Sequence, residues 1–336
     1  MTDPYYRRFV SFGELLIRLS SGRGELLSRA RSVAVDIGGS EANVAATLAG
    51  LGHGCAMIST VPVNALGDAA VMTLRSAGVD CSNVITSDGR MGLYWLETGA
   101  GGRASDVIYD REASSFSCLS ESALDWRVLL ADADRLHLSG ITVALNATSA
   151  SIALAAAARA KEMGVPVSFD GNYRERLWRA RGNVDRAALC KLAACADIFL
   201  GNYRDINLLL GTKFDGDNQV GRRAACEAAF VAFPALRLIA STLRTTYHTN
   251  RHGIAVRVDT PDNGLETDVM DIPSVVDRIG TGDAFAAGIL HADRLNYSLA
   301  DIAAQGRVLC ALKHTIGGDF GNINTAHVRR FAEAGS

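Results

Sequence analysis

The chain has 336 residues, of which 48% are hydrophobic and 21% charged, a composition typical of a globular protein with a large core. Its 34 basic and 36 acidic residues nearly cancel, which excludes a global field for nucleic acid or for an anionic membrane. No run of about 18 uncharged apolar residues predicts a membrane span, and the charged N-terminal segment lacks a signal core. Seven scattered cysteines without a C-x-x-C pair predict reduced thiols in a cytoplasmic protein and no metal site.

Short apolar strands alternate with helices along most of the chain. The predicted strands are Phe9–Ile17, Cys55–Ser59, Arg135–Ser139, Val165–Asp170, Ile198–Asn202 and Leu236–Thr242. The predicted helices are Glu41–Leu51, Asp68–Ala77, Ala147–Met163, Val184–Ala194, Arg222–Phe230, Thr281–Ala292 and Leu299–Thr315. This alternation favours an α/β fold whose parallel sheet is covered by helices on both faces.

Two segments interrupt this alternation. Ser32–Ile37 and Met91–Tyr109 have alternating polarity and few helical residues, and Gly99–Arg103 is typical of a hairpin turn. They predict a small second sheet that projects over the main one as a lid. Since exposed sheet edges tend to pair, we expect a homodimer or a higher homo-oligomer.

A pair of glycines, Gly38 and Gly39, precedes the first long helix. Ser40 is a candidate N-cap, and Asn43 falls on the first turn, so its amide can point back toward whatever the glycines approach. Neither G-x-G-x-x-G nor the P-loop pattern occurs. Taken alone, a glycine pair is a common and weak signal, and a structural turn is its default interpretation.

A second glycine signal, Gly280-Thr281-Gly282-Asp283, precedes a helix near the other end of the chain. Such a loop can turn its backbone N–H groups toward one point, and the helix adds the positive end of its dipole, so an anion site is predicted. A carboxylate there would repel the anion, so its presence indicates a chemical role. The natural role is to accept a proton from a hydroxyl that attacks a phosphoryl group. The alternative is a glycine turn into a buried helix, with Asp283 as an ordinary first-turn acid.

The two signals in this order resemble the signatures of the ribokinase-like family of carbohydrate kinases, whose second signature is usually Asp-Thr-x-Gly-Ala-Gly-Asp and stands here as residues 277–283. The resemblance implies a three-layer Rossmann-type sheet with a small β-sheet lid, as one kinase domain over residues 1–330 with lid strands from about 32–37 and 91–110. It also implies ATP and Mg²⁺. A monovalent-cation site is common in the family near this loop.

Further segments resemble the subgroup that phosphorylates 2-keto-3-deoxygluconate. They are residues 12–20, 92–94, 107–111, 169–178 and 311–319. The resemblance implies a substrate site formed by Gly39, Asn43, Tyr94, Tyr109, Arg111 and Arg174. Independently, arginine presents a planar fork that suits a substrate carboxylate, and Tyr109 and Arg111 face the same side of a strand. Without the resemblance, a lid-core tyrosine and solvated arginines are the ordinary readings.

The implied reaction is in-line transfer of the ATP γ-phosphoryl group to the C6 hydroxyl of 2-keto-3-deoxygluconate. Asp283 would accept the proton while Gly280, Thr281 and Gly282 form the anion hole. The nucleotide and its magnesium would lie near Asn202, Asp205, Thr242 and Arg244; Asp205 stands where the family has Glu, and the family's glycines after Leu243 are missing. The alternatives are a kinase of the same fold acting on a neutral ketose or another sugar acid, and a catalytically silent sugar-binding regulator.

Overall fold

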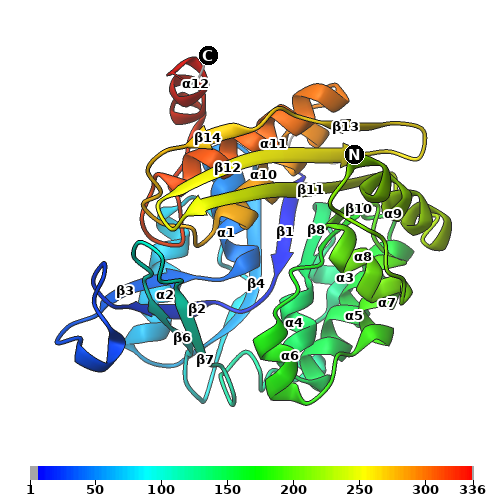
Figure 1. Cartoon of the computed structure of the whole chain (residues 1–336). Helices are drawn as coiled ribbons and strands as arrows, with labels where there is room; N and C mark the ends of the chain where they lie inside the picture. The colour runs from blue at the N-terminus through cyan, green and yellow to red at the C-terminus, as the bar shows by residue number, and fades with distance from the viewer. Residues whose placement is uncertain (1–6, 335–336) are drawn as a thin grey trace.

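The computed structural model describes residues 7–334 and contains one large, mostly parallel sheet (Figure 1). Its strand order is β13-β12-β11-β10-β9-β8-β1-β4-β5, and β14 also pairs with β12. The antiparallel pairs all involve β12. The strands are β1 (Arg8–Phe12), β4 (Cys55–Pro62), β5 (Val84–Ser87), β8 (Ala133–Ser139), β9 (Val167–Asp170), β10 (Ile198–Leu200), β11 (Leu238–His248), β12 (Arg251–Asp259), β13 (Gly264–Glu266) and β14 (Met270–Ile272).

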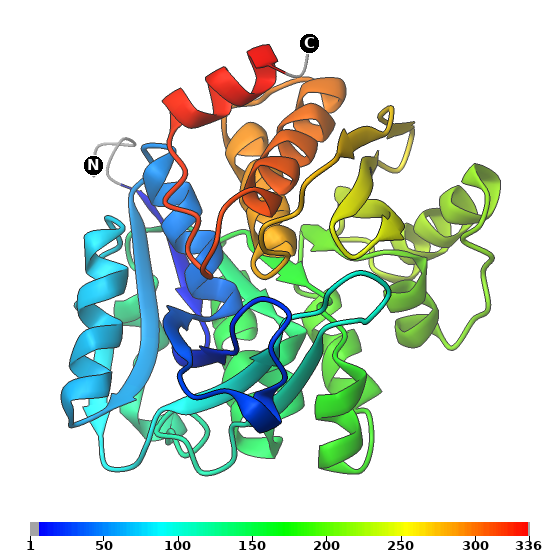
Figure 2. The ribbon, with the colours of Figure 1, turned by 60° about the vertical axis from the view of Figure 1, so that its left-hand side comes forward.

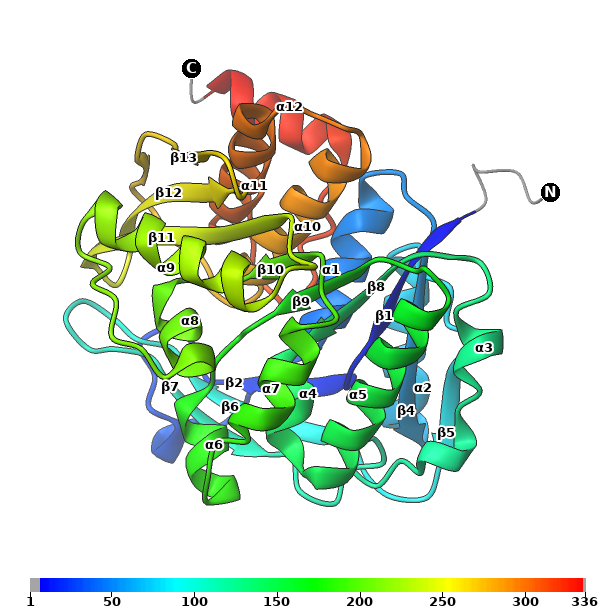
Figure 3. The same cartoon turned by 90° about the vertical axis from the view of Figure 1, so that its right-hand side faces the viewer.

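Helices cover both faces of this sheet, so the fold has three layers (Figures 1 and 3). One core cluster joins the sheet to α1 (Ser40–Gly50), α2 (Ala65–Ser76), α10 (Thr281–Arg294) and α11 (Leu299–His314). The other joins it to α3 (Trp126–Leu129), α4 (Gly140–Leu145), α5 (Ala147–Glu162), α6 (Glu175–Arg181), α7 (Arg186–Ala193), α8 (Tyr203–Leu210) and α9 (Gln219–Ala232). The last helix, α12 (Thr325–Ala334), packs on α11 (Figure 2).

A separate four-stranded sheet has the order β3-β2-β6-β7 and lies over one edge of the main body (Figure 1). Its strands are β2 (Leu16–Ser20), β3 (Ala34–Gly38), β6 (Gly92–Glu97) and β7 (Asp106–Asp110). Pairing places Asp36, Arg18, Tyr94 and Tyr109 in one row across the sheet. The adjacent row, Val35, Leu19, Trp95 and Ile108, therefore faces the other side. The predicted small sheet is thus present, with one polar and one apolar face.

Some predicted elements differ from the structure. The single strand expected at Phe9–Ile17 is wrong: β1 ends at Phe12 in the main sheet, and β2 begins at Leu16 in the small one. The chain crosses between the sheets at Gly13, where a side chain would collide with the carboxylate of Glu41. The turn at Gly99–Arg103 is present, with Ala100 and Arg103 exchanging backbone hydrogen bonds, but the pattern did not predict β12, β13 and β14.

The strand order places a binding crevice at the carboxyl ends of the central strands. The order runs from β1 to β4 and β5 in one direction and from β1 to β8 and β9 in the other, and ligands in open α/β sheets bind where the strand order reverses in this way. The small sheet lies at this end (Figure 1). Among residues 7–334, no helix is long and apolar enough to cross a membrane, and all seven cysteines are free thiols.

Candidate active site

A cavity of about 1040 Å³ lies between the polar face of the small sheet and the carboxyl ends of the main strands. Its volume is ample for a nucleotide and a small sugar together. It brings together every residue proposed from the sequence: Gly39, Asn43, Tyr94, Tyr109, Arg111, Arg174, Asn202, Asp205, Thr242, Arg244, Gly280, Thr281, Gly282 and Asp283 all line it.

The loop before α10 has the geometry of an anion site. Gly280 is the N-cap, with a left-handed φ of 75°, and no side chain caps the helix. A Cβ at this position would lie 2.7 Å from the carbonyl oxygen of Asp319, so only glycine fits this turn. The first N–H groups of a helix have no partner within it, and here they open onto the cavity beside the positive end of the helix dipole.

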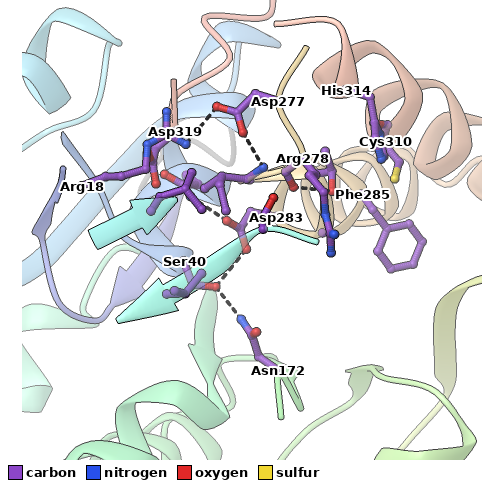
Figure 4. A pocket seen from close by; sticks show the side chains of 18 of the residues that line it. Arg18, Ser40, Asn172, Asp277, Arg278, Asp283, Phe285, Cys310, His314 and Asp319 are labelled. Carbon is purple, nitrogen blue, oxygen red and sulfur yellow. Dashed lines mark hydrogen bonds and ion pairs between the residues drawn. The ribbon is translucent and has the colours of Figure 1, made fainter. Parts of the chain in front are cut away.

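Asp283 lies on the first turn of α10, beneath this loop (Figure 4). Its Oδ1 accepts a hydrogen bond from the hydroxyl of Ser40 at 2.9 Å, and its Oδ2 accepts one from Nδ2 of Asn43 at 2.6 Å. Burial raises the pKa of Asp283 above its usual range, although these two hydrogen bonds oppose the shift. The carboxyl is thus held in one orientation and is a better proton acceptor than an exposed aspartate.

Ser40 is not the helix cap expected from the sequence. Gly39 is the N-cap of α1, and Ser40 is its first residue. The Ser40 hydroxyl instead accepts a hydrogen bond from Nδ2 of Asn172 at 2.8 Å and donates to Asp283 (Figure 4). Asn172 has a left-handed φ of 42°, a strained conformation that is frequent at functional sites. Neither hydrogen bond of Ser40 was predicted, because Ser40, Asn172 and Asp283 come from three distant segments of the chain.

One polar atom of the Asn43 side chain has no hydrogen-bond partner among the described residues. Its Nδ2 must face the Asp283 carboxylate, which only accepts hydrogen bonds, so the amide orientation is fixed. Oδ1 then has no partner among the described residues, although Asn43 is only 4% exposed. This buried acceptor borders the cavity and can receive a ligand hydroxyl.

Three further carboxyl groups surround Asp283. Burial raises the pKa of Glu41 to about 7. Burial and the neighbouring Asp283 and Asp205 raise that of Asp170 well above its usual range, and burial also raises that of Asp205. Of these, Asp170 and Glu41 were not proposed from the sequence as site residues.

Arginines of two kinds line the same cavity. Arg174, Arg244 and Arg278 are exposed at the cavity, and within residues 7–334 no hydrogen bond or ion pair engages their guanidinium groups. Arg111 differs: it is buried, and its Nε donates to Oε2 of Glu14 at 2.6 Å. The predicted pair of carboxylate-binding arginines therefore consists of one unpaired arginine and one arginine already neutralised by Glu14.

The two tyrosines proposed from the sequence face each other across β6 and β7. The ring centroids of Tyr94 and Tyr109 are 6.4 Å apart. The Tyr94 hydroxyl donates to Oδ1 of Asp319 at 3.0 Å, and burial raises its pKa well above the usual range. Tyr94 therefore offers the cavity an aromatic wall, while its hydroxyl proton is already used.

The small sheet is fastened to the segments around the anion loop by Arg18. This arginine, 3% exposed, bonds Asp36 of β3 and Asp277 before the loop, each at 2.9 Å, and pairs with Asp319 at 3.2 Å (Figure 4). Burial raises the pKa of Asp319 to about 6. Because the three carboxyls come from different segments, Arg18 couples the position of the lid to that of the loop.

Asn202 and Asp205, proposed for the nucleotide and its metal, form a capping box at the start of α8. Asp205 accepts the N–H of Asn202 at 2.8 Å. In the described part of the chain, no group of three or more His, Cys, Asp or Glu residues could hold a metal ion by itself. A divalent ion there would need ligands from water or phosphate.

The chain is similar to known proteins over most of its length. Residues 7–233 match the model of the pfkB family carbohydrate kinases. The 2-dehydro-3-deoxygalactonokinase of Haloferax volcanii is 32% identical over 97% of this chain and 96% of its own. The 2-dehydro-3-deoxygluconokinase of Bacillus subtilis is 27% identical over 94% and 92%. The crystal structure of 2-dehydro-3-deoxygluconokinase from Thermotoga maritima has a TM-score of 0.92 and 32% identity, covering 97% of this chain and 99% of that one.

An anion loop, a buried carboxyl that can act as a base and a lid over a three-layer sheet together define a phosphoryl-transfer enzyme. The chain belongs to the pfkB family of carbohydrate kinases. The ribokinase-like fold and the resemblance to the kinases of 2-keto-3-deoxygluconate, also called 2-dehydro-3-deoxygluconate, are thereby confirmed.

Proposed function

We propose that this kinase transfers the γ-phosphoryl group of ATP to the C6 hydroxyl of 2-keto-3-deoxygluconate, giving 2-keto-3-deoxy-6-phosphogluconate. The observation that carries the proposal is Arg174, a guanidinium without a partner in the described chain that lines the same cavity as Asp283. Its charge lowers the pKa of Asp283 against the larger effect of burial. An unpaired cation so close to the base favours an anionic substrate over a neutral one.

The substrate end of the cavity matches a sugar acid in several ways. Arg174 offers the carboxylate two parallel N–H donors, and the Arg111–Glu14 pair supports the wall beside it. Tyr94 and Tyr109 border the carbon chain. Gly39 lines the cavity with a φ of 150°, and a side chain there would collide with the carbonyl oxygen of Glu14, so only glycine fits this turn. Oδ1 of Asn43 is left to accept a substrate hydroxyl.

Catalysis in this proposal rests on Asp283 and the anion loop. Asp283 accepts the C6 hydroxyl proton as the oxygen attacks the γ-phosphorus. The N–H groups of the loop stabilise the charge on the transferred phosphoryl group. Ser40 and Asn43 keep the carboxyl in place throughout, since both contacts are hydrogen bonds to its acceptor oxygens.

The residues at the other end of the cavity suit ATP and Mg²⁺. Arg244 and Arg278 are unpaired cations beside the uncapped helix, as a triphosphate requires. Asp205 and Asp170 would hold Mg²⁺ through water, and a cation there would relieve the repulsion that raises the pKa of Asp170. When bound, magnesium neutralises phosphate charge.

The galactonate epimer of the substrate is a second candidate, because the Haloferax volcanii relative is named a 2-dehydro-3-deoxygalactonokinase. Both compounds carry the same carboxylate and the same C6 hydroxyl, so Arg174 and Asp283 keep their roles with either. The sugar hydroxyl that differs between them has no assigned partner in the cavity.

The test is ADP release with ATP and Mg²⁺ over a panel of 2-keto-3-deoxygluconate, its galactonate epimer, gluconate, fructose and ribose. We expect turnover confined to the two keto-deoxy acids. In Arg174→Ala, the loss of a half-exposed charge-assisted contact of about 2 kcal/mol lowers kcat/KM for the acid roughly 30-fold. Turnover of fructose instead, unaffected by this substitution, would replace the proposal with a neutral-ketose kinase.

Arg179→Ala is the matched control. Arg179 lies on α6, whose N-cap is Arg174, and it is exposed. Its one ion-pair partner among the described residues is Glu175, four residues before it. Loss of Arg179 should leave kcat/KM unchanged. Binding of ligand by a chain that releases no ADP with any sugar would favour a silent regulator.

We also propose that the chain forms a homodimer through the outer face of the small sheet. Val35, Leu19, Trp95 and Ile108 form an apolar row there, and Val35 and Ile108 are 60% and 52% exposed. Leu19 and Trp95 between them are half-buried, and an exposed apolar patch of this kind is typical of a protein interface. A second copy would bury the same row by two-fold symmetry.

A further inference from the structure

A buried lysine lies directly behind the anion loop. Lys313, near the end of α11, is 1% exposed, and its Nζ donates to the carbonyl oxygen of Ile316 at 2.9 Å. It is not among the described residues that line the cavity, and none of the described carboxylates forms an ion pair with it within 4.0 Å. Because burying an ammonium group costs several kcal/mol unless it is compensated, its presence calls for a reason.

The lysine stem is packed against the loop itself. A Cβ at Gly280 would lie 3.2 Å from Cε of Lys313, and one at Gly321 would lie 3.1 Å from its Cδ. The side chain thus passes between the glycine that starts α10 and the turn that follows α11. Ile316, which accepts its hydrogen bond, belongs to that same turn, so the side chain is anchored in the turn while its stem packs against the start of α10.

Lys313 also interacts electrostatically with the carboxyl groups around the anion loop, including Asp283. Burial lowers its pKa, and Asp277, Asp319 and Asp283 oppose that shift. Asp277 and Asp319 are already engaged by Arg18, so they offer the lysine only longer-range attraction. Lys313 in turn lowers the pKa of Asp283. In a poorly hydrated interior such a charge acts over a greater distance than in water.

We propose that Lys313 is a positioning residue for phosphoryl transfer: its side chain fixes the anion loop from behind, and its ammonium group supplies a positive charge there. The proposal rests on the proposed kinase reaction and adds a residue outside the cavity to it. It also has a consequence for ion dependence. With a lysine ammonium built in at this place, the enzyme needs no added monovalent cation.

The first test is on the unaltered enzyme, with turnover measured in potassium, sodium and tetramethylammonium chloride at constant ionic strength. We expect the same kcat in all three salts. A kcat several-fold higher in potassium than in tetramethylammonium would overturn the proposal. Turnover of the sugar acid in this assay also tests the proposed function separately, since it does not depend on Lys313 being substituted.

The second test is Lys313→Met, which keeps the length of the stem and removes the charge. We expect kcat to fall about 100-fold and the Mg²⁺ complex of a non-hydrolysable ATP analogue to bind about tenfold more weakly by calorimetry. Lys313→Ala should regain activity when methylammonium is added. Wild-type analogue affinity and kcat in a folded Lys313→Met protein would refute the role.

A purely structural role would not move the pH profile. Without the Lys313 charge, the acid limb of kcat should shift to higher pH, because the pKa of Asp283 rises. The other charged groups that act on Asp283 are unchanged by this substitution; they are Arg174, Asp170 and Glu41. Lys161→Met is the control, since Lys161 also donates to a backbone carbonyl, that of Ala194, and has no other hydrogen-bond or ion-pair partner in the described chain, but lies on the surface. An unshifted acid limb in Lys313→Met would count against the proposal.

Discussion

The role of Asp283 can be tested with little disturbance of the fold, because Asp283→Asn is nearly isosteric. The introduced amide oxygen can accept from Nδ2 of Asn43, as the carboxylate does at 2.6 Å. The introduced amide nitrogen can donate to the Ser40 hydroxyl, whose oxygen has a second lone pair beside the one that Asn172 uses. Every hydrogen bond of the site therefore has a substitute, and only the base is lost.

The expected magnitude follows from that geometry. A positioned general base contributes about 10²–10⁴-fold to the rate, which corresponds to about 3–5 kcal/mol of barrier. Stability should not fall. A carboxyl whose folded pKa is raised contributes stability below its unfolded pKa and loses that contribution as pH rises through the folded pKa. At neutral pH the ionised Asp283 is thus a cost, which the amide removes.

The assay is kcat for ADP release, together with the melting temperature and the affinity for the Mg²⁺ complex of a non-hydrolysable ATP analogue. We expect a kcat reduced at least 100-fold, with melting temperature and affinity unchanged or higher. In the unaltered enzyme, kcat should be lost as pH falls through the raised pKa of Asp283, above the ordinary aspartate value of 3.8. A variant that keeps more than about one-tenth of wild-type kcat would refute Asp283 as the base.

Three more predictions concern the lid. Tyr94→Phe removes the hydrogen bond to Asp319 and should lower the free energy of unfolding by about 1 kcal/mol; an unchanged denaturant midpoint would contradict that bond. Glu14→Gln leaves Arg111 buried without its carboxylate and should cost about 3–5 kcal/mol, whereas Glu14→Gln combined with Arg111→Met should cost less than the sum of the single changes. Val35→Glu places a charge in the exposed apolar row and should give a monomer by light scattering; a dimer that persists would place the interface elsewhere.

The sequence predicted the main sheet better than its edge. The apolar strands and the helices between them are long enough for their periodicity to be plain. β12 was not predicted because its buried residues include Arg257 and Asp259, which pair with each other at 2.6 Å inside the sheet. A pattern that counts these side chains as polar cannot detect a buried strand. The break between β1 and β2 was not predicted for another reason. It depends on one residue, Gly13, which lets the chain pass close to Glu41, and a single residue leaves no periodic pattern in the sequence.

The site residues could be predicted where neighbouring residues in the sequence determine their geometry. Gly280 and Asp283 are adjacent to a helix start, so their geometry follows from neighbouring residues. The partners of Asp283 are not local: Ser40 precedes it by 243 residues along the chain. Arg111 shows the same limit. Strand periodicity put it on the same side as Tyr109, although β7 ends at Asp110, and could not reveal that Glu14 neutralises it.

Beyond the Arg18 and Arg111 ion pairs, the cavity holds charged groups of both signs that no opposite charge of the described chain neutralises. Arg174, Arg244 and Arg278 line the cavity without partners in the described chain. Partial desolvation within the cavity, together with repulsion from Arg244 and Arg174, lowers the pKa of Arg278. The carboxyls of Asp170 and Asp283 lie deeper, with raised pKa values. Both arrangements cost free energy in the absence of ligands. Triphosphate and metal would compensate Arg244, Arg278 and Asp170, and a substrate hydroxyl would face Asp283, but a neutral sugar would leave Arg174 unpaired. The sugar acid of the proposed function would compensate all of these groups at once.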